Sequence, residues 1–196
     1  MFFALGAVPF YADAVGEVVT NLTFFIGAIF FTLAALIQLL LSGRRPPRSG
    51  TSRADRADWW AAAVQFVGTL FFNLSTSAAL ITAVNENARV GSGWRPDAWG
   101  SICFLVASAL AVVATTDREG LWDPKARSWR CTWLNMAGSV FFGLSAIGAY
   151  VIPTTSDLVS QFWANAGTFL GALCFLVAAL LSRRDIPVDA APAPAL

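Results

Sequence analysis

Histidine is absent from this chain of 196 residues, and lysine occurs once. Without histidine the chain lacks the commonest metal ligand, the commonest general base and a frequent haem ligand. The sequence also contains no glycine-rich phosphate loop, no nucleophile elbow and no H-E-x-x-H motif. These absences predict a protein that is not an enzyme and that has no catalytic, cofactor-binding or metal-binding residues.

Charged residues are scarce, at 13% of the chain against about a quarter in a soluble domain. They lie between five long apolar runs that contain no Asp, Glu, Lys or Arg, at 21–41, 59–84, 99–115, 131–152 and 161–182. Each run approaches the roughly 20 residues that a helix needs to cross a bilayer. The sequence therefore predicts an all-α, polytopic transmembrane helical bundle. Its expected partner is the lipid bilayer, and no binding of nucleic acid is expected. Because the acidic residues lie outside the runs, no carboxylate relay for ion-coupled transport is expected.

The positive charges are divided unequally between the connections. Segments 42–58 and 116–130 and the residues after Leu181 hold all but two of the thirteen Lys and Arg residues. Cytoplasmic connections of membrane proteins carry more Lys and Arg residues than the connections on the outer side of the membrane. We therefore expect both basic segments and the C-terminus to be cytoplasmic, in the inner (plasma) membrane of a bacterium. The preference for arginine over lysine suggests a GC-rich bacterial genome.

Two helix types alternate along the chain. The first type carries GTLFFNLS at 68–75 and GSVFFGLS at 138–145, and the second carries GSICFLVASAL at 100–110 and GALCFLVAALL at 171–181. A further second-type copy, GAIFFTLAALI, occupies 27–37. The pattern predicts a repeated two-helix hairpin. We expect a truncated hairpin over 1–41, a basic linker over 42–58, hairpins over 59–115 and 131–182 joined by a linker over 116–130, and a disordered tail over 183–196.

The opening segment, MFFALGAVP, fits this alternation. FFALGA at 2–7 aligns with FFNLST at 71–76 and FFGLSA at 141–146. Met1–Pro9 is thus expected to be the outer end of a first-type helix, which makes five full spans plus a truncated first helix. Its start then lies roughly 10–20 residues upstream. The alternative expectation places the segment along the membrane interface, anchored by Phe2, Phe3, Phe10 and Tyr11.

Small residues are expected to bring these helices together. Gly27, Gly100 and Gly171 begin the second-type motif, and Gly167 with Gly171 forms a G-x-x-x-G. In lipid, close backbone approach at small residues is a main source of helix association. Cys103 and Cys174 occupy equivalent positions, and together with Cys131 we interpret them as packing residues.

Polar residues follow one stripe of the first-type helices. Gln65, Thr69 and Asn73 are spaced by four, and Asn135, Ser139 and Gly143 are their equivalents; Asn21 and Asn165 are equivalent residues of the second type. Amides in hydrocarbon must be hydrogen-bonded, so the stripe is expected to face protein. It predicts either bonds between helices or a polar seam that admits a small solute or lipid headgroup. In the loop at 85–100, Arg95 and Asp97 are expected to pair.

The residue pattern in the segments WRPDAWGSICFLVASALA and NAGTFLGALCFLVAALL resembles that of the YrhK-like domain family of small bacterial membrane proteins. The resemblance covers about 59–184, as a tandem arrangement rather than a single domain. It implies a helical membrane domain without an established activity and supplies no site residues.

Two functions remain open on the sequence. The first is a scaffold or accessory membrane subunit that packs against itself or against other membrane proteins. The alternative is a transporter of a small solute or lipid, with hairpin repeats that run in the same sense because each hairpin returns the chain to its starting side. A continuous polar cavity along Gln65, Asn73 and Asn135 would favour the transporter, whereas dry packing there would favour the scaffold.

Overall fold

The chain folds into a bundle of six helices in a computed structural model that describes residues 1–43, 45–85 and 93–182. The helices are α1 Phe2–Gly6, α2 Pro9–Leu41, α3 Arg53–Val84, α4 Pro96–Glu119, α5 Arg127–Gly148 and α6 Gln161–Ser182. The described residues form no strand beyond isolated bridges. The predicted all-α helical bundle is thereby confirmed. The tail expected to be disordered, 183–196, lies outside the described residues.

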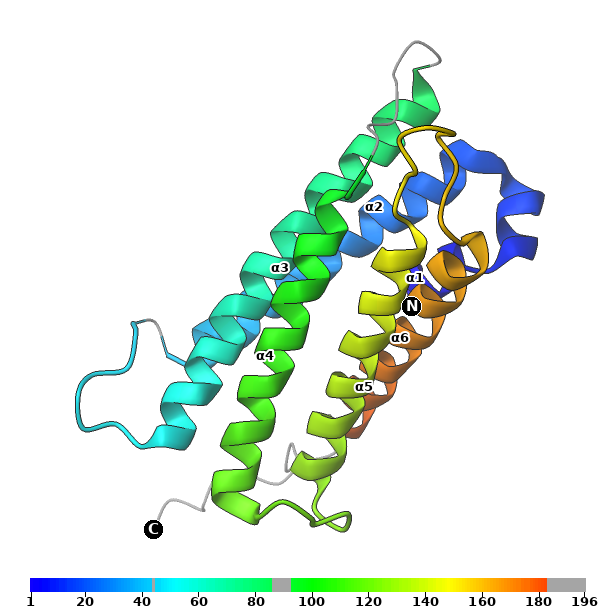
Figure 1. The fold of residues 1–196 in the computed structure, drawn as a ribbon. Helices are drawn as coiled ribbons and strands as arrows, with labels where there is room; N and C mark the ends of the chain where they lie inside the picture. The colour runs from blue at the N-terminus through cyan, green and yellow to red at the C-terminus, as the bar shows by residue number, and fades with distance from the viewer. Residues whose placement is uncertain (44, 86–92, 183–196) are drawn as a thin grey trace, which may run out of the picture.

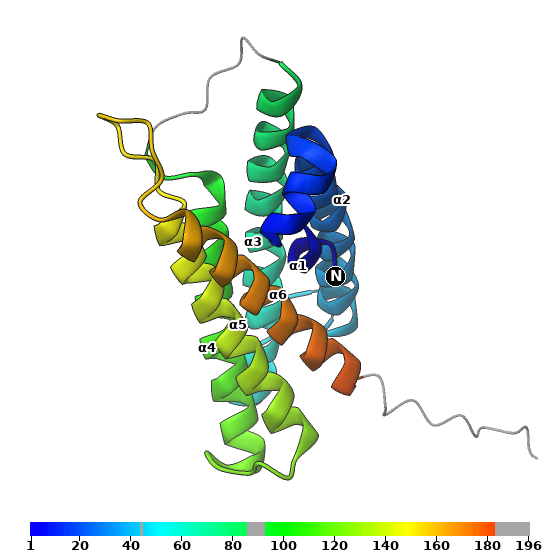
Figure 2. The same ribbon diagram turned by 90° about the vertical axis from the view of Figure 1, so that its right-hand side faces the viewer.

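The helices close into a ring (Figures 1 and 2). α3 packs against α4 and α5 against α6; α2 contacts α3, α4 contacts α5, and α1 contacts both α2 and α6. The connections 42–52 and 120–126 lie at one end of the bundle, called the basic end below (Figure 1). The connection 149–160 and the start of α4 lie at the opposite end.

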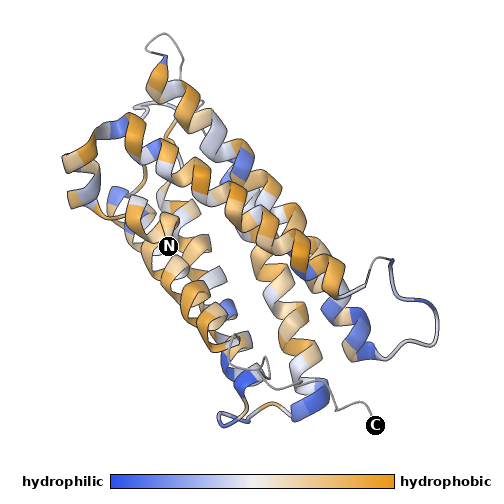
Figure 3. Ribbon diagram, turned by 180° about the vertical axis from the view of Figure 1, so that it is seen from behind, coloured by the Kyte–Doolittle hydropathy of each residue, from blue (hydrophilic) through white to orange (hydrophobic). Residues whose placement is uncertain are grey.

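Five helices, α2 to α6, are long and apolar enough to cross a membrane. Large apolar side chains such as Ile37 and Leu74 are exposed on their outer faces, as lipid contact requires. Figure 3 shows the hydrophobic colouring along the helices and the hydrophilic colouring mainly at their ends. The bundle therefore presents an apolar surface toward the bilayer.

The helices extend beyond the uncharged runs. α3 begins at Arg53, where the Ser52 hydroxyl accepts a hydrogen bond of 3.1 Å from the backbone N–H of Asp55. α4 begins at Pro96, whose missing N–H is not needed in the first turn of a helix. α5 ends at Gly148, before the end of its run, because Val151 pairs with Gly93 and Leu158 instead. Short charged helix ends thus project beyond the apolar surface.

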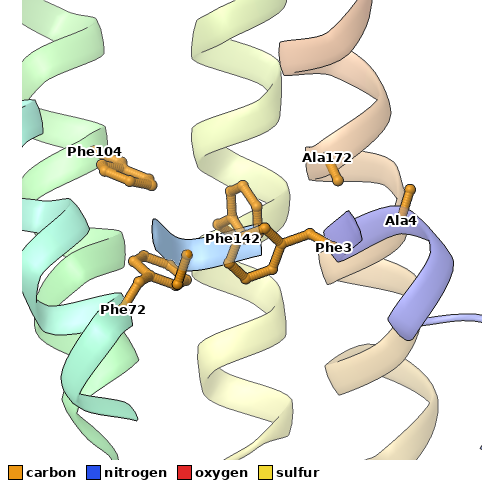
Figure 4. Close-up of a cluster of buried hydrophobic side chains, with 7 residues drawn as sticks. Phe3, Ala4, Phe72, Phe104, Phe142 and Ala172 are labelled. Carbon is orange, nitrogen blue, oxygen red and sulfur yellow. The ribbon is translucent and has the colours of Figure 1, made fainter. Parts of the chain in front are cut away.

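The centre of the bundle is a layer of six phenylalanine rings, called the phenylalanine layer below: Phe3, Phe72 and Phe142 from first-type positions, and Phe31, Phe104 and Phe175 from second-type positions. The first three rings contact one another at centroid distances of 5.5–6.2 Å. The second three do so at 5.4–5.9 Å. Figure 4 shows Phe3, Phe72, Phe104 and Phe142 converging from four helices. Two triangles of rings therefore stack on each other at the point where all the helices meet.

Glycines make room for these rings. A Cβ on Gly100 would lie 2.6 Å from the Phe72 ring, and one on Gly68 would lie 2.8 Å from the Phe104 ring. The α5–α6 pair shows the same reciprocal contacts between Gly138 and Phe175 and between Gly171 and Phe142 (at 3.0 and 3.1 Å). Each hairpin is thus held by two aromatic rings that lie over the bare backbone of the facing helix.

α1 places Phe3 in this layer, where it is 9% exposed. The alternative expectation that Phe3 anchors the opening segment at the membrane interface is therefore wrong. Phe10 is 80% exposed, whereas the Tyr11 hydroxyl is bonded to the Thr23 hydroxyl at 2.8 Å. The opening segment thus contributes to the core as well as to the surface.

Gly100→Ala tests the close approach. The added methyl would meet the Phe72 ring and the Gly68 carbonyl oxygen, 2.9 Å away, so we expect a loss of about 1–3 kcal/mol in stability. Gly143→Ala is the matched control, since its Cβ meets only Leu105 at 3.5 Å. It should leave stability unchanged or raise it by up to about 1 kcal/mol. Thermal unfolding in detergent, followed by tryptophan fluorescence, compares them; equal midpoints would contradict the packing argument.

Candidate functional site

Two cavities lie on either side of the phenylalanine layer. The axial pocket, of about 290 Å³, lies at the opposite end from the basic loops and is lined by residues of all six helices. The side cavity, of about 550 Å³, is bordered mainly by α1, α2, α5 and α6, with Gln65 from α3. Phe3 and Phe142 line both cavities. The aromatic rings therefore form the partition between them.

Asn73 and Ser139 of the predicted polar stripe join helices in the interior, whereas the Thr69 hydroxyl donates within α3 to the Phe66 carbonyl at 2.7 Å. Thr69 and Ser139 are fully buried. The Asn73 amide donates to the Thr32 hydroxyl on α2 and to the Thr69 carbonyl, the latter at 2.9 Å. The Ser139 hydroxyl is bonded to Ser108 on α4 at 2.7 Å. This part of the stripe holds neighbouring hairpins together.

Gln65 and Asn135 behave differently. Both line the side cavity, and among the described residues neither side-chain amide has a hydrogen-bond partner; only the Asn135 backbone carbonyl is used, by Ser139 at 2.9 Å. The expectation that the whole stripe is hydrogen-bonded within the protein is therefore wrong for these two amides. The reason is local, because the side cavity opens where a facing helix would otherwise supply partners.

Asn21 and Asn165, the second-type pair, line the axial pocket. The Asn21 amide donates to the Glu17 carbonyl at 3.0 Å, and the Asn165 side-chain oxygen accepts from Gln161 at 3.3 Å. The seven residues of the predicted seam are thus divided between the interior and two separate cavities. They form no continuous path, since the phenylalanine layer intervenes.

Sequence reasoning expected Asp97 to pair with Arg95 and missed its place in the axial pocket. Asp97 is the second residue of α4 and lines the axial pocket, where its Oδ1 is buried without a hydrogen-bond partner. The expected Arg95–Asp97 ion pair is not among those that the described residues form, although Arg95 is near enough for its charge to act on the carboxylate. The signal was present in the sequence, because alignment of the second-type helices pairs Asp97 with Phe24 and Thr168, which also line the pocket.

The three cysteines are free thiols, and the Cys131 Sγ donates to the Ala178 carbonyl on α6 at 3.5 Å. Cys131 also lines the side cavity. Cys103 and Cys174 lie in their helices one residue before Phe104 and Phe175 of the phenylalanine layer.

Comparison with protein-family models, curated proteins and solved structures finds no match to this chain. Its class therefore follows from its own fold. Five apolar helices long enough to span a bilayer, with their charges at the ends, make it a multi-pass integral membrane protein.

Asn73→Leu and Ser139→Ala test the bonds between helices. Each removes a side-chain bond to another helix and should lower stability by about 0.6–2 kcal/mol. Gln65→Leu is the matched control for Asn73→Leu, because the Gln65 amide has no partner among the described residues and lines an open cavity. Thermal unfolding in detergent should separate the two classes. If Gln65→Leu destabilised the protein as much as Asn73→Leu, the stabilising role assigned to the hydrogen bonds between helices would be contradicted.

Proposed function

We propose that this membrane protein is a non-enzymatic scaffold or accessory subunit that holds a transmembrane helix of another membrane protein in its side cavity. The observation that carries the proposal is the place of the cavity. α3 and α5, the first-type helices, each pack along a second-type helix, whereas α1 provides five residues beside α2 and α6. The side cavity extends from Met1 and Phe2 toward Ser182 near the basic end.

Helix faces form the wall of the side cavity. Residues of α1, α2, α5 and α6 border it, together with Gln65 of α3. An occupant of helical shape therefore fits it best. Gln65 and Asn135 line the wall at equivalent positions, so the occupant is expected to offer a polar side chain at their level. Small residues on the occupant would allow close approach.

The transporter alternative requires a route through the bundle. The six rings of the phenylalanine layer lie between the two cavities, and Thr69 and Ser139 are fully buried in dry contacts. This arrangement supports the scaffold in preference to a passage for solute.

Family and orientation are part of the same proposal. We propose a bacterial inner-membrane protein related to the YrhK-like domains in tandem, with the basic end in the cytoplasm. The support for the orientation is the positive charge of segments 42–58 and 116–130, which lie at one end of the bundle together with the end of α6 (Figure 1). The proposed family rests on the sequence resemblance alone.

A photo-crosslinking amino acid at position 65 or 135 tests the helix-binding role in native membranes. We expect an adduct of one defined mass from these positions and none from position 109, which faces outward on α4. Ala179→Trp, which fills the side cavity, should abolish the adduct, whereas Ala109→Trp should not. An adduct at twice the chain's own mass would identify a second copy as the occupant. Lipid adducts alone would contradict the accessory role.

Cysteine labelling tests the orientation. In a variant without its native cysteines, Gly50→Cys and Ser156→Cys place thiols in connections at the two ends of the bundle. A membrane-impermeant maleimide should label position 156 in intact cells and position 50 only after the membrane is opened. Labelling of both positions from the same side would refute the five-span topology, and the reverse pattern would refute the cytoplasmic placement of the basic end.

A further inference from the structure

The axial pocket contains an unmet hydrogen-bonding group. Asp97 Oδ1 is buried and has no hydrogen-bond partner among the described residues, although the carboxylate as a whole is stabilised by the Ser75 hydroxyl on α3 and by the backbone N–H groups of Asp97 and Ala98. A buried polar atom left without a partner costs free energy, and a buried charge costs more. Such a cost is often offset when a ligand supplies the missing donor.

The surroundings of Asp97 suit an ammonium group. The floor of the pocket is the Phe3, Phe72 and Phe142 triangle of the phenylalanine layer, and Phe24 lies in its wall. Ring faces attract cations, and a carboxylate beside them adds charge and a hydrogen-bond acceptor. Because Oδ1 lacks a donor, an ammonium that still carries N–H groups fits better than a fully methylated one.

Arg95 determines what else the ligand must carry. Arg95 and Asp97 are the only charged residues among the described lining of this pocket, and Arg95 makes no ion pair with another described residue. A simple cation would be attracted by the Asp97 carboxylate and repelled by the Arg95 guanidinium. A molecule with an anionic group next to its ammonium satisfies both. The side-chain amides of Asn21, Asn165 and Gln161 line the same pocket and offer further polar contacts.

We propose that the axial pocket binds a small zwitterion with a primary ammonium, its N–H groups donating to Asp97 and its anionic group accepting from Arg95. The volume of about 290 Å³ is close to the lower limit for small-molecule sites, about 300 Å³. Free amino acids and the headgroup of phosphatidylethanolamine share this chemistry. This site is independent of the helix proposed for the side cavity.

Equilibrium dialysis of isotope-labelled glycine against the whole protein in a maltoside detergent tests the site. We expect saturable binding, with competition by unlabelled glycine but little by glycine betaine, which has no N–H, or by ethanolamine, which has no anionic group. Asp97→Asn and Arg95→Gln should each weaken binding about tenfold or more. Asp13→Asn and Arg48→Gln, at exposed positions outside the pocket, are the matched controls and should bind as the original chain does.

A merely structural role for Asp97 predicts a different result. Replacing a buried carboxylate whose Oδ1 lacks a partner by a neutral amide should leave the unliganded thermal midpoint of Asp97→Asn unchanged or higher. Loss of binding together with an unchanged midpoint supports the site. A large fall in the midpoint of Asp97→Asn would overturn it, as would equal binding of glycine and glycine betaine.

Nanodiscs distinguish the two sources of the ligand. If the occupant is a lipid headgroup, phosphatidylethanolamine should raise the thermal midpoint above that in phosphatidylcholine, and Asp97→Asn should remove the difference. If it is a free solute, glycine should raise the midpoint in phosphatidylcholine and the two lipids should not differ. If neither glycine nor phosphatidylethanolamine stabilises the original chain in preference to Asp97→Asn, or if sodium ions alone reproduce the effect, the proposal is refuted.

Discussion

The packing of phenylalanine rings on glycine backbone is the contact on which the rest of this bundle depends. In lipid there is no hydrophobic force between helices, so their association requires many close contacts. A ring such as Phe72 lies over Gly100, where a Cβ would come within 2.6 Å, and Phe104 returns the contact at Gly68. The same pairing recurs between α5 and α6. Helices brought this close bring the six rings of the phenylalanine layer into mutual contact.

The phenylalanine layer also separates the polar chemistry of the protein. On one side the axial pocket gathers Arg95 and Asp97 together with several amides and hydroxyls, and on the other the side cavity contains Gln65 and Asn135. Between the two cavities, the buried hydroxyls of Thr69 and Ser139 form hydrogen bonds within the protein. Two sites of different character thus fit into a small bundle, one suited to a small polar molecule and the other to an apolar helix with a polar residue.

Charge at the two ends of the bundle has two different roles. At the basic end Arg118 on α4 pairs with Asp55 and Asp58 on α3, and Arg53 lies 3.6 Å from Asp117. These side chains are 29–71% exposed to solvent, so each pair contributes little to stability. At the other end Asp97 is turned into the bundle and its Oδ1 has no partner among the described residues. The buried carboxyl oxygen without a partner is the group that suggests a ligand.

The sequence by itself determined the class of fold, because uncharged runs of about 20 residues have one stable form in a bilayer, the helix. It also identified Gly100 and Gly171 as points of close helix approach, since their position in the second-type motif is repeated. It did not determine which polar residues are satisfied. Helical periodicity assigns Gln65, Thr69 and Asn73 to one stripe, but a partner exists only where another helix lies opposite, and that depends on how the helices close into a ring. For the same reason only the tertiary structure showed that Asp97, in the first turn of α4, lines a pocket inside the bundle.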